Sequence, residues 1–249
     1  MRRELNDNER QRYHRQLRLD GFGEAGQQRL KSTSVLISRA GGVGGNTAVA
    51  LAMAGVGRLT LAHGGTLHWE HLNRWAWATP NDVGRVPSEV LGEHIRRINP
   101  EVEVVTVAEN ATEENVAKLV ADNDAIVDGA PIFEERYLLH REAVLQKKPA
   151  VMGAMFSNEG YVTTYLPDAG PCLKCIYPNK PDYWTDHTVF PAIAPGPLTV
   201  ASISAMEAIK AVTGYGKPLV GVLWYFDIET MVTRKFKVHR RPDCEVCGG

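Results

Sequence analysis

The sequence has no apolar run of the about 20 residues that a membrane-spanning helix needs. Residues 1–16 are polar and lack the apolar core of a secretory signal peptide. Neither sign of charge is in excess, because 28 basic residues face 29 acidic ones. This balance does not favour nucleic acid as a partner. Together these absences predict a soluble cytoplasmic protein with neither a nucleic-acid nor a membrane partner.

Cysteine is scarce, and no cysteine lies outside two Cys-x-x-Cys pairs, Cys172 with Cys175 and Cys244 with Cys247. Four thiolates form the ligand set of a closed, tetrahedral structural zinc site. The pairs stand roughly 70 residues apart, farther than the ~15 to 20 residues of a compact zinc ribbon. Two disulfides or a thioredoxin-like redox pair are the alternatives, and both fit a cytoplasmic chain less well. We therefore predict structural zinc.

Strand and helix patterns alternate through the first part of the chain. Asn6 followed by Glu9 is a capping-box pattern, which predicts a helix over residues 6–19. This alternation is typical of an α/β, doubly wound, Rossmann-like fold with a mainly parallel sheet. The strands are expected at 34–38, 58–62, 102–108, 125–128 and 150–154, and the helices at 47–54, 89–98, 113–121 and 134–147.

The pattern changes near residue 160. Residues 161–166 and 221–238 are strand-like, with one helix expected at 198–213, and this succession predicts a C-terminal antiparallel extension. Residues 178–197 are rich in proline and aromatic residues and predict a long loop. We expect one globular unit with two regions. Residues 1–160 form the N-terminal helix and the nucleotide-binding-type region. Residues 161–249 form the antiparallel extension and a crossover segment, which the zinc site is expected to hold in place.

A glycine turn, with Gly41, Gly42 and Gly44, follows the first expected strand and precedes a helix. Backbone N–H groups at such a helix start favour a phosphate, although glycines there can also serve only close strand–helix packing. The dinucleotide-binding pattern would begin with glycine at position 39, which is Arg39. The second strand leads to His63 rather than to a ribose-binding acid. These residues argue against an NAD-dependent oxidoreductase.

Several segments resemble the MoeB, ThiF and HesA proteins in order and spacing over nearly the full length. They are RYHRQLRLDGFGEAGQQRL (12–30), VLISRAGGVGGN (35–46), AGVGRLTL (54–61), LNR (72–74), INP (98–100), PCLKC (171–175), AMEAIKAVTGYGKP (205–218) and CEVCG (244–248). The resemblance implies homodimers that bind ATP and magnesium and adenylate the C-terminal glycine of a ubiquitin-like sulfur carrier. It also implies that the widely spaced cysteine pairs pin the C-terminus to the crossover, and that a partner's tail threads past Trp184 and His187.

The resemblance carries several site residues onto this chain. Arg15 matches an arginine that reaches the partner subunit's phosphates, and Arg74 matches the second phosphate-binding arginine. The family's lysine falls on Pro87, and Arg85 two residues away could supply that charge instead. Asp128 matches an aspartate that ends the fourth strand, three residues before the family's magnesium-binding aspartate.

Other family positions differ in this chain. His63 replaces the ribose-binding aspartate, His71 an asparagine, Trp75 a glutamine, and Pro131 the magnesium-binding aspartate. Proline cannot coordinate a metal, so the substitutions argue against the family's use of ATP and magnesium. The two histidines could bind an acidic group of another ligand, with Trp75 and Trp77 as a stacking surface. As ordinary polar or core residues they would need no ligand.

Two interpretations remain open. The chain is either a divergent carboxylate-activating adenylyltransferase that acts on a ubiquitin-like or peptide C-terminus, or a non-catalytic paralogue. The paralogue would be a zinc-stabilised dimer that binds a peptide tail, a ubiquitin-like protein or a biosynthetic enzyme. Retained Arg15 and Arg74 favour the first interpretation, whereas Pro87 and Pro131 favour the second.

Overall fold

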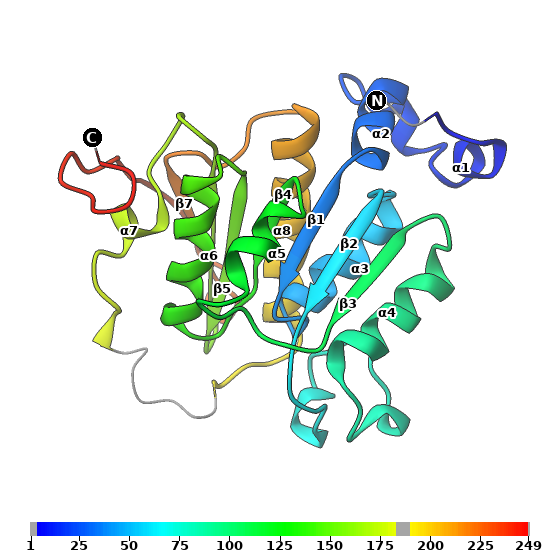
Figure 1. The fold of residues 1–249 in the computed structure, drawn as a ribbon, viewed down its shortest axis with the longest axis horizontal. Coiled ribbons are helices and arrows are strands. Elements are labelled where there is room, and N and C mark those ends of the chain that lie inside the picture. The colour runs from blue at the N-terminus through cyan, green and yellow to red at the C-terminus, as the bar shows by residue number, and fades with distance from the viewer. Residues whose placement is uncertain (1–3, 183–189, 249) are drawn as a thin grey trace.

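A computed structural model describes residues 4–182 and 190–248, and Trp184 and His187 lie outside these ranges. Its centre is an eight-stranded sheet in the order β3-β2-β1-β4-β5-β6-β7-β8, with helices on both faces (Figure 1). Within these two ranges, no helix has the length and apolar character needed to span a membrane.

Parallel strands form one side of the sheet and antiparallel strands the other, which confirms the predicted fold class. The chain order reverses beside β1, whose last residue Ser38 pairs with Ala62 on one side and Asp128 on the other. A ligand crevice usually lies at the carboxyl ends of strands at such a reversal. The parallel strands are β1 (Ser34–Ser38), β2 (Arg58–Ala62), β3 (Glu103–Val107), β4 (Ala125–Asp128) and β5 (Ala150–Phe156), and the antiparallel strands are β6 (Glu159–Tyr165), β7 (Val222–Asp227) and β8 (Thr233–Lys237).

Two hydrophobic clusters, one on each face, bury the parallel strands. Successive side chains of a strand point to opposite faces, so Val35 and Ile37 join one cluster and Leu36 the other. The first cluster includes residues of α2 (Gly23–Lys31), α3 (Gly44–Ala54), α4 (Pro87–Ile98) and α8 (Pro195–Thr213), and the second includes residues of α5 (Val116–Ala121), α6 (Phe133–Leu145) and α7 (Leu173–Ile176).

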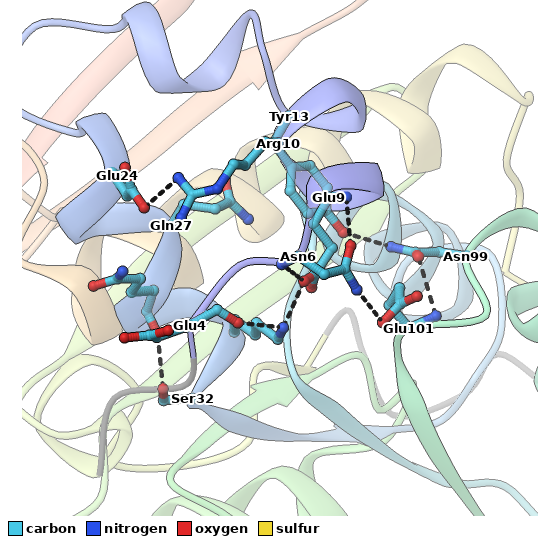
Figure 2. Close-up of polar contacts among 12 residues, drawn as sticks. Glu4, Asn6, Glu9, Arg10, Tyr13, Glu24, Gln27, Ser32, Asn99 and Glu101 are labelled. Carbon is cyan, nitrogen blue, oxygen red and sulfur yellow. Dashed lines mark hydrogen bonds and ion pairs between the residues drawn. The ribbon is translucent and has the colours of Figure 1, made fainter.

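The expected capping box at the start of α1 (Asp7–Arg12) is confirmed. The Asn6 side chain accepts a hydrogen bond from the Glu9 N–H at 2.9 Å, and the Glu9 carboxylate accepts one from the Asn6 N–H at 2.8 Å. The predicted helix over residues 6–19 is too long, because α1 ends before Tyr13 and a separate 3-10 turn, η1 (Gln16–Arg18), follows. Tyr13 is buried there, and Asn99 Nδ2 donates to its hydroxyl at 2.9 Å (Figure 2).

Some helix boundaries differ from the prediction. Helix α2, which contains two glycines, was not predicted. The predicted starts of α3 and α8 are three residues too late, and that of α5 is three residues too early. The first turn of α8 contains Pro195 and Pro197. Proline is tolerated in a first turn because no N–H there is paired within the helix.

Polar contacts anchor the N-terminal segment to the far end of α3. Glu9 is buried and forms an ion pair with Lys31 at 2.5 Å. The side-chain amides of Gln16 and Gln27 both donate to the carbonyl of Ala54, the last residue of α3, at 3.0 and 2.8 Å. At 1.5 Å per residue, α3 holds this segment about 16 Å from the glycine turn at the helix start.

Replacement of Asn99 by alanine should destabilise the fold. The buried Asn99 amide also donates to the Ala52 carbonyl at 2.6 Å, so its loss leaves buried acceptors unpaired. We expect the free energy of unfolding, measured in urea, to fall by about 1–3 kcal/mol. Asn81→Ala, at an exposed position, is the control and should change it by less than about 0.5 kcal/mol. Equal values for the two variants would contradict this account.

Candidate functional site

A cavity of about 260 Å³ lies at the carboxyl ends of the parallel strands, where the strand order reverses. Its walls come from the glycine turn after β1, the segments that follow β2 and β4, the strand β5 and the start of α8. The structure therefore places the cavity where α/β proteins of this topology bind ligands.

The glycine turn brings β1, α3 and the end of β4 close together. A Cβ atom on Gly44 would lie 2.4 Å from the Arg39 carbonyl oxygen, and one on Gly129 would lie 2.8 Å from the Gly44 nitrogen. Gly41 and Gly42 line the cavity. Arg39 has a φ of 59°, in the left-handed region that favours glycine. The arginine thus stands at a backbone position of the kind glycine usually occupies.

A stack of aromatic rings forms one wall of the cavity. The rings of His71 and Trp75 stack with centroids 4.1 Å apart and planes 9° apart, and Trp77 lies behind Trp75 at 5.1 Å. Both tryptophans are buried, and only Trp75 lines the cavity. A Cβ on Gly41 would touch the Trp75 indole at 3.5 Å. The expected stacking surface therefore packs mainly on itself, and Trp75 fills the space beside the glycine turn.

His63 and His71 both line the cavity as neutral side chains near pH 7. Burial, together with the nearby Arg39 guanidinium, lowers the pKa of His63 to about 4. Burial, followed by the charge of Arg74, also lowers the pKa of His71. The two rings can therefore offer hydrogen bonds to a ligand without adding positive charge.

Two cavity arginines form ion pairs with buried acids. Arg39 Nε donates to Glu135 at 2.6 Å, and the same carboxylate accepts a hydrogen bond from Ser38 Oγ at 2.8 Å. Arg136 Nη1 donates to Asp128 at 3.0 Å, and its Nη2 donates to the Gly153 carbonyl at 3.3 Å. Neither Glu135 nor Arg136 was among the predicted site residues, although they follow one another at the start of α6, directly after the β4 loop.

Asp128 lies beneath the cavity and is fully buried. One carboxylate oxygen accepts the Ala130 N–H at 2.8 Å, and the other contacts Arg136 and His140 Nε2, the latter at 3.3 Å. Burial alone would raise the pKa of Asp128, but Arg136 and His140 together hold it below its ordinary value. Both oxygens are engaged within the protein, so Asp128 contributes to the cavity through Arg136.

Arg74 is the predicted phosphate-binding arginine that the structure brings to the cavity. Its Nη1 donates to the Glu70 carbonyl and to Asn73 Oδ1, both at 2.8 Å. Asn46 fixes its backbone, because the Asn46 amide donates to the carbonyls of both Gly42 and Arg74, at 2.6 and 2.9 Å. The glycine turn and the Arg74 segment are thus held together by one side chain of α3.

The other two predicted arginines lie elsewhere. Arg85 does not line the cavity and pairs with Asp82 at 3.0 Å and with Glu93 at 2.5 Å. Pro87, at the family's lysine position, is the first residue of α4. Arg15 is exposed beside Gln16, at the far end of α3 from the glycine turn. Within one chain, the structure therefore brings neither Arg15 nor Arg85 to the cavity.

The four cysteines form a second, separate cluster. They are buried free thiols, and their sulfur atoms all lie within 4.8 Å of one another. Neighbouring sulfurs are 3.4 to 4.0 Å apart, close to the about 3.8 Å expected around a tetrahedral zinc ion with zinc–sulfur bonds of about 2.3 Å. The Arg241 N–H donates to the Cys175 sulfur at 3.3 Å. The cluster can hold one metal ion, and zinc remains the predicted one.

Serine at Cys172 or Cys247 should remove one metal ligand and with it most of the bound zinc. We expect each variant to contain well under one zinc per chain by elemental analysis and to unfold at a lower temperature, because structural zinc contributes directly to folding. Lys174→Ala, which changes a residue between two ligands without removing a thiolate, is the control and should keep its zinc. Full metal retention in both serine variants would overturn the assignment.

His63 should make the stability of the protein depend on pH. Because its pKa is lowered to about 4 in the folded state, the unfolded chain binds the proton more readily. The stability that neutral His63 contributes is fully present above the ordinary histidine pKa of about 6.5 and falls as the pH approaches 4. We expect the unfolding free energy in urea to drop between pH 7 and pH 5, and to drop less in His63→Asn. Equal drops would contradict the shift.

Comparison with known sequences gives relatives along nearly the whole chain. A heterocyst HesA protein of Trichormus variabilis is 41% identical over 98% of this chain and 91% of its own length. The sulfur carrier protein adenylyltransferase of Thermus thermophilus is 36% identical, over 95% of this chain and 90% of its own. The molybdopterin-synthase adenylyltransferase of Escherichia coli is 35% identical, over 98% and 99%. Two of these three relatives are thus named as adenylyltransferases.

Solved structures share the fold. Escherichia coli MccB with ATP superposes with a TM-score of 0.86 at 23% identity, covering 96% of this chain and 75% of that one. The family description "ThiF family" matches residues 13–246, which include the glycine turn, the cavity arginines, Cys172, Cys175 and Cys244. On this match and on the identities above, the chain belongs to the ThiF family.

Proposed function

We propose that this chain is a divergent ThiF-family protein that binds the C-terminal tail of a peptide or ubiquitin-like partner in the cavity, without magnesium-dependent ATP chemistry. The lining of the cavity is the observation that carries this proposal. Arginines and neutral histidines line it, and no carboxylate does among the described residues. Magnesium is usually held by one or two protein carboxylates together with substrate phosphates. Pro131 lines the cavity at the family's metal-binding position.

The size of the cavity supports the same conclusion. Its volume of about 260 Å³ is below the about 300–1,000 Å³ of typical small-molecule pockets. Trp75 lies between the end of β2 and the glycine turn, the space in which nucleotide-binding folds of this kind hold the ribose. His63 offers no carboxylate to ribose hydroxyls. An adenosine would therefore have to displace buried tryptophan packing.

The chemistry of the cavity fits the end of a polypeptide. Arg74 offers a guanidinium, which can bind a carboxylate through two parallel hydrogen bonds. One relative is named as a sulfur carrier protein adenylyltransferase, and a solved structure holds MccB together with MccA. A polypeptide ends in a carboxylate, and this group is the one that we propose enters the cavity.

We further propose a cytoplasmic homodimer with one structural zinc per chain. Arg15 is exposed and held about 16 Å from the glycine turn of its own chain by the length of α3. It could contribute to a cavity only in a second copy, as the family resemblance implies. Four free thiols suit a reducing compartment.

Adenylation is the second candidate function. The glycine turn and Arg74 keep their places around the cavity, and two of the relatives above are named as adenylyltransferases. This candidate requires Trp75 to move away from Gly41 when nucleotide binds.

Titration calorimetry with ATP and magnesium separates the two candidates. We expect no heat of binding at millimolar ATP with the zinc-loaded full chain, and no exchange of pyrophosphate into ATP when a carboxylate-bearing peptide is added. The Thermus thermophilus sulfur carrier protein adenylyltransferase with a sulfur carrier protein is the positive control. ATP binding together with pyrophosphate exchange above background would overturn the proposal and establish adenylation.

A further inference from the structure

We infer that the cavity selects a ligand group with a single negative charge and that Arg74 recognises this group. Glu135 and Asp128 neutralise the other two cavity arginines and so limit the negative charge that can bind. The inference rests on the proposed function, because it describes the ligand of the same cavity. It concerns the charge that the ligand carries, which the ion pairs around the cavity determine.

Glu135 neutralises the first cavity arginine. Its carboxylate is 3% exposed and lies 2.6 Å from Arg39 Nε, while Ser38 Oγ donates to its other oxygen at 2.8 Å. A buried carboxylate is costly unless it is paired, so Glu135 holds the Arg39 charge within the protein. Arg39 therefore forms part of the wall without being available as a full charge to a ligand.

Asp128 neutralises the second cavity arginine in the same way. Asp128 is fully buried and lies 3.0 Å from Arg136 Nη1. The second amino group of Arg136 donates to the Gly153 carbonyl, which holds the guanidinium plane against β5. His140 contacts Asp128 but does not line the cavity.

Arg74 carries the remaining positive charge. In the described part of the chain it forms no ion pair, and its side chain donates hydrogen bonds to two uncharged acceptors, the Glu70 carbonyl and Asn73 Oδ1. The exposed Glu70 carboxylate acts on it only over a longer range. His63 and His71 add no charge near pH 7, and the start of α3 adds about half a charge from its aligned peptide dipoles.

A single free cation suits a carboxylate better than a polyphosphate. A carboxylate can pair with the planar guanidinium through two hydrogen bonds, which leaves no uncompensated charge in the cavity. A pyrophosphate or triphosphate would bring several negative charges, and those without a partner would have to lose water at a high cost. By neutralising Arg39 and Arg136, Glu135 and Asp128 thus determine which class of anion the cavity can bind.

NMR titrations with three probes test this selectivity at constant ionic strength and without divalent metal. The probes are N-acetylglycylglycine, its C-terminal amide and inorganic pyrophosphate, and the readout is the indole N–H signal of Trp75. In the unaltered protein, the free acid should bind more tightly than either the amide or pyrophosphate. Arg74→Gln should weaken binding of the acid by about tenfold or more. Arg234→Gln, on the exposed strand β8, is the control and should bind all three probes as the unaltered protein does.

Glu135→Gln should shift the selectivity of the cavity from the free acid towards pyrophosphate. Without its acidic partner, Arg39 becomes a second free cation, and the affinity for pyrophosphate should rise about tenfold. Arg39→Met/Glu135→Gln should lack this gain, because the freed cation is then absent. If thermal unfolding shows that Glu135→Gln does not fold, Ala192→Lys supplies a second free cation at a half-buried lining position. That variant should raise pyrophosphate affinity about threefold or more.

The outcomes separate the inference from the proposed function. Tighter binding of pyrophosphate than of the acid by the unaltered protein would overturn the inference alone. So would unchanged acid binding in Arg74→Gln, or no gain for pyrophosphate in either charge variant. If neither anion shifts the Trp75 signal, the proposed function is overturned together with the inference.

Discussion

Two ion pairs between the first turn of α6 and the ends of β1 and β4 are the constraint on which the cavity depends. Glu135 binds Ser38 and Arg39 at the end of β1, and Arg136 binds Asp128 at the end of β4. Removing one partner of a buried pair leaves an uncompensated charge, which costs about 3–5 kcal/mol. The pairs therefore fix both the position of α6 and the number of charges that the cavity presents.

Aromatic packing occupies the space beside the glycine turn. Trp75 is in contact with His71 on one side and Trp77 on the other, and its indole lies against Gly41. Asn46 ties the backbone of the Arg74 segment, next to Trp75 in the chain, to the glycine turn. The cavity of this ThiF-family chain therefore has an aromatic wall beside the glycine turn.

The sequence predicted the sheet and the cysteine cluster well, because both depend on local patterns. Apolar β-branched runs such as Val35–Ile37 must be buried on both faces, and paired Cys-x-x-Cys knuckles bring four thiols together once the C-terminus returns to the crossover. The charge arrangement could not be read in the same way. Arg39 lies far from Asp128 and Glu135 in the sequence, and only the tertiary fold decides which acid neutralises which arginine. Arg85 was also expected at the cavity, because it lies two residues from Pro87 in the sequence. In the structure it forms ion pairs with Asp82 and Glu93 instead.

The pairing of cysteines far apart in sequence also affects the unfolded chain. A metal ion bound to both knuckles would close a loop of roughly 70 residues, and a covalent cross-link over such a loop lowers the entropy of the unfolded ensemble by the equivalent of about 4 kcal/mol. The loop contains α8, whose Pro197 lines the cavity, and β7 and β8. In the unfolded chain, a cross-link at the knuckles would therefore restrict the conformations of the segment that folds into α8. The cysteines would act on one wall of the cavity in this way, although no cysteine lines the cavity.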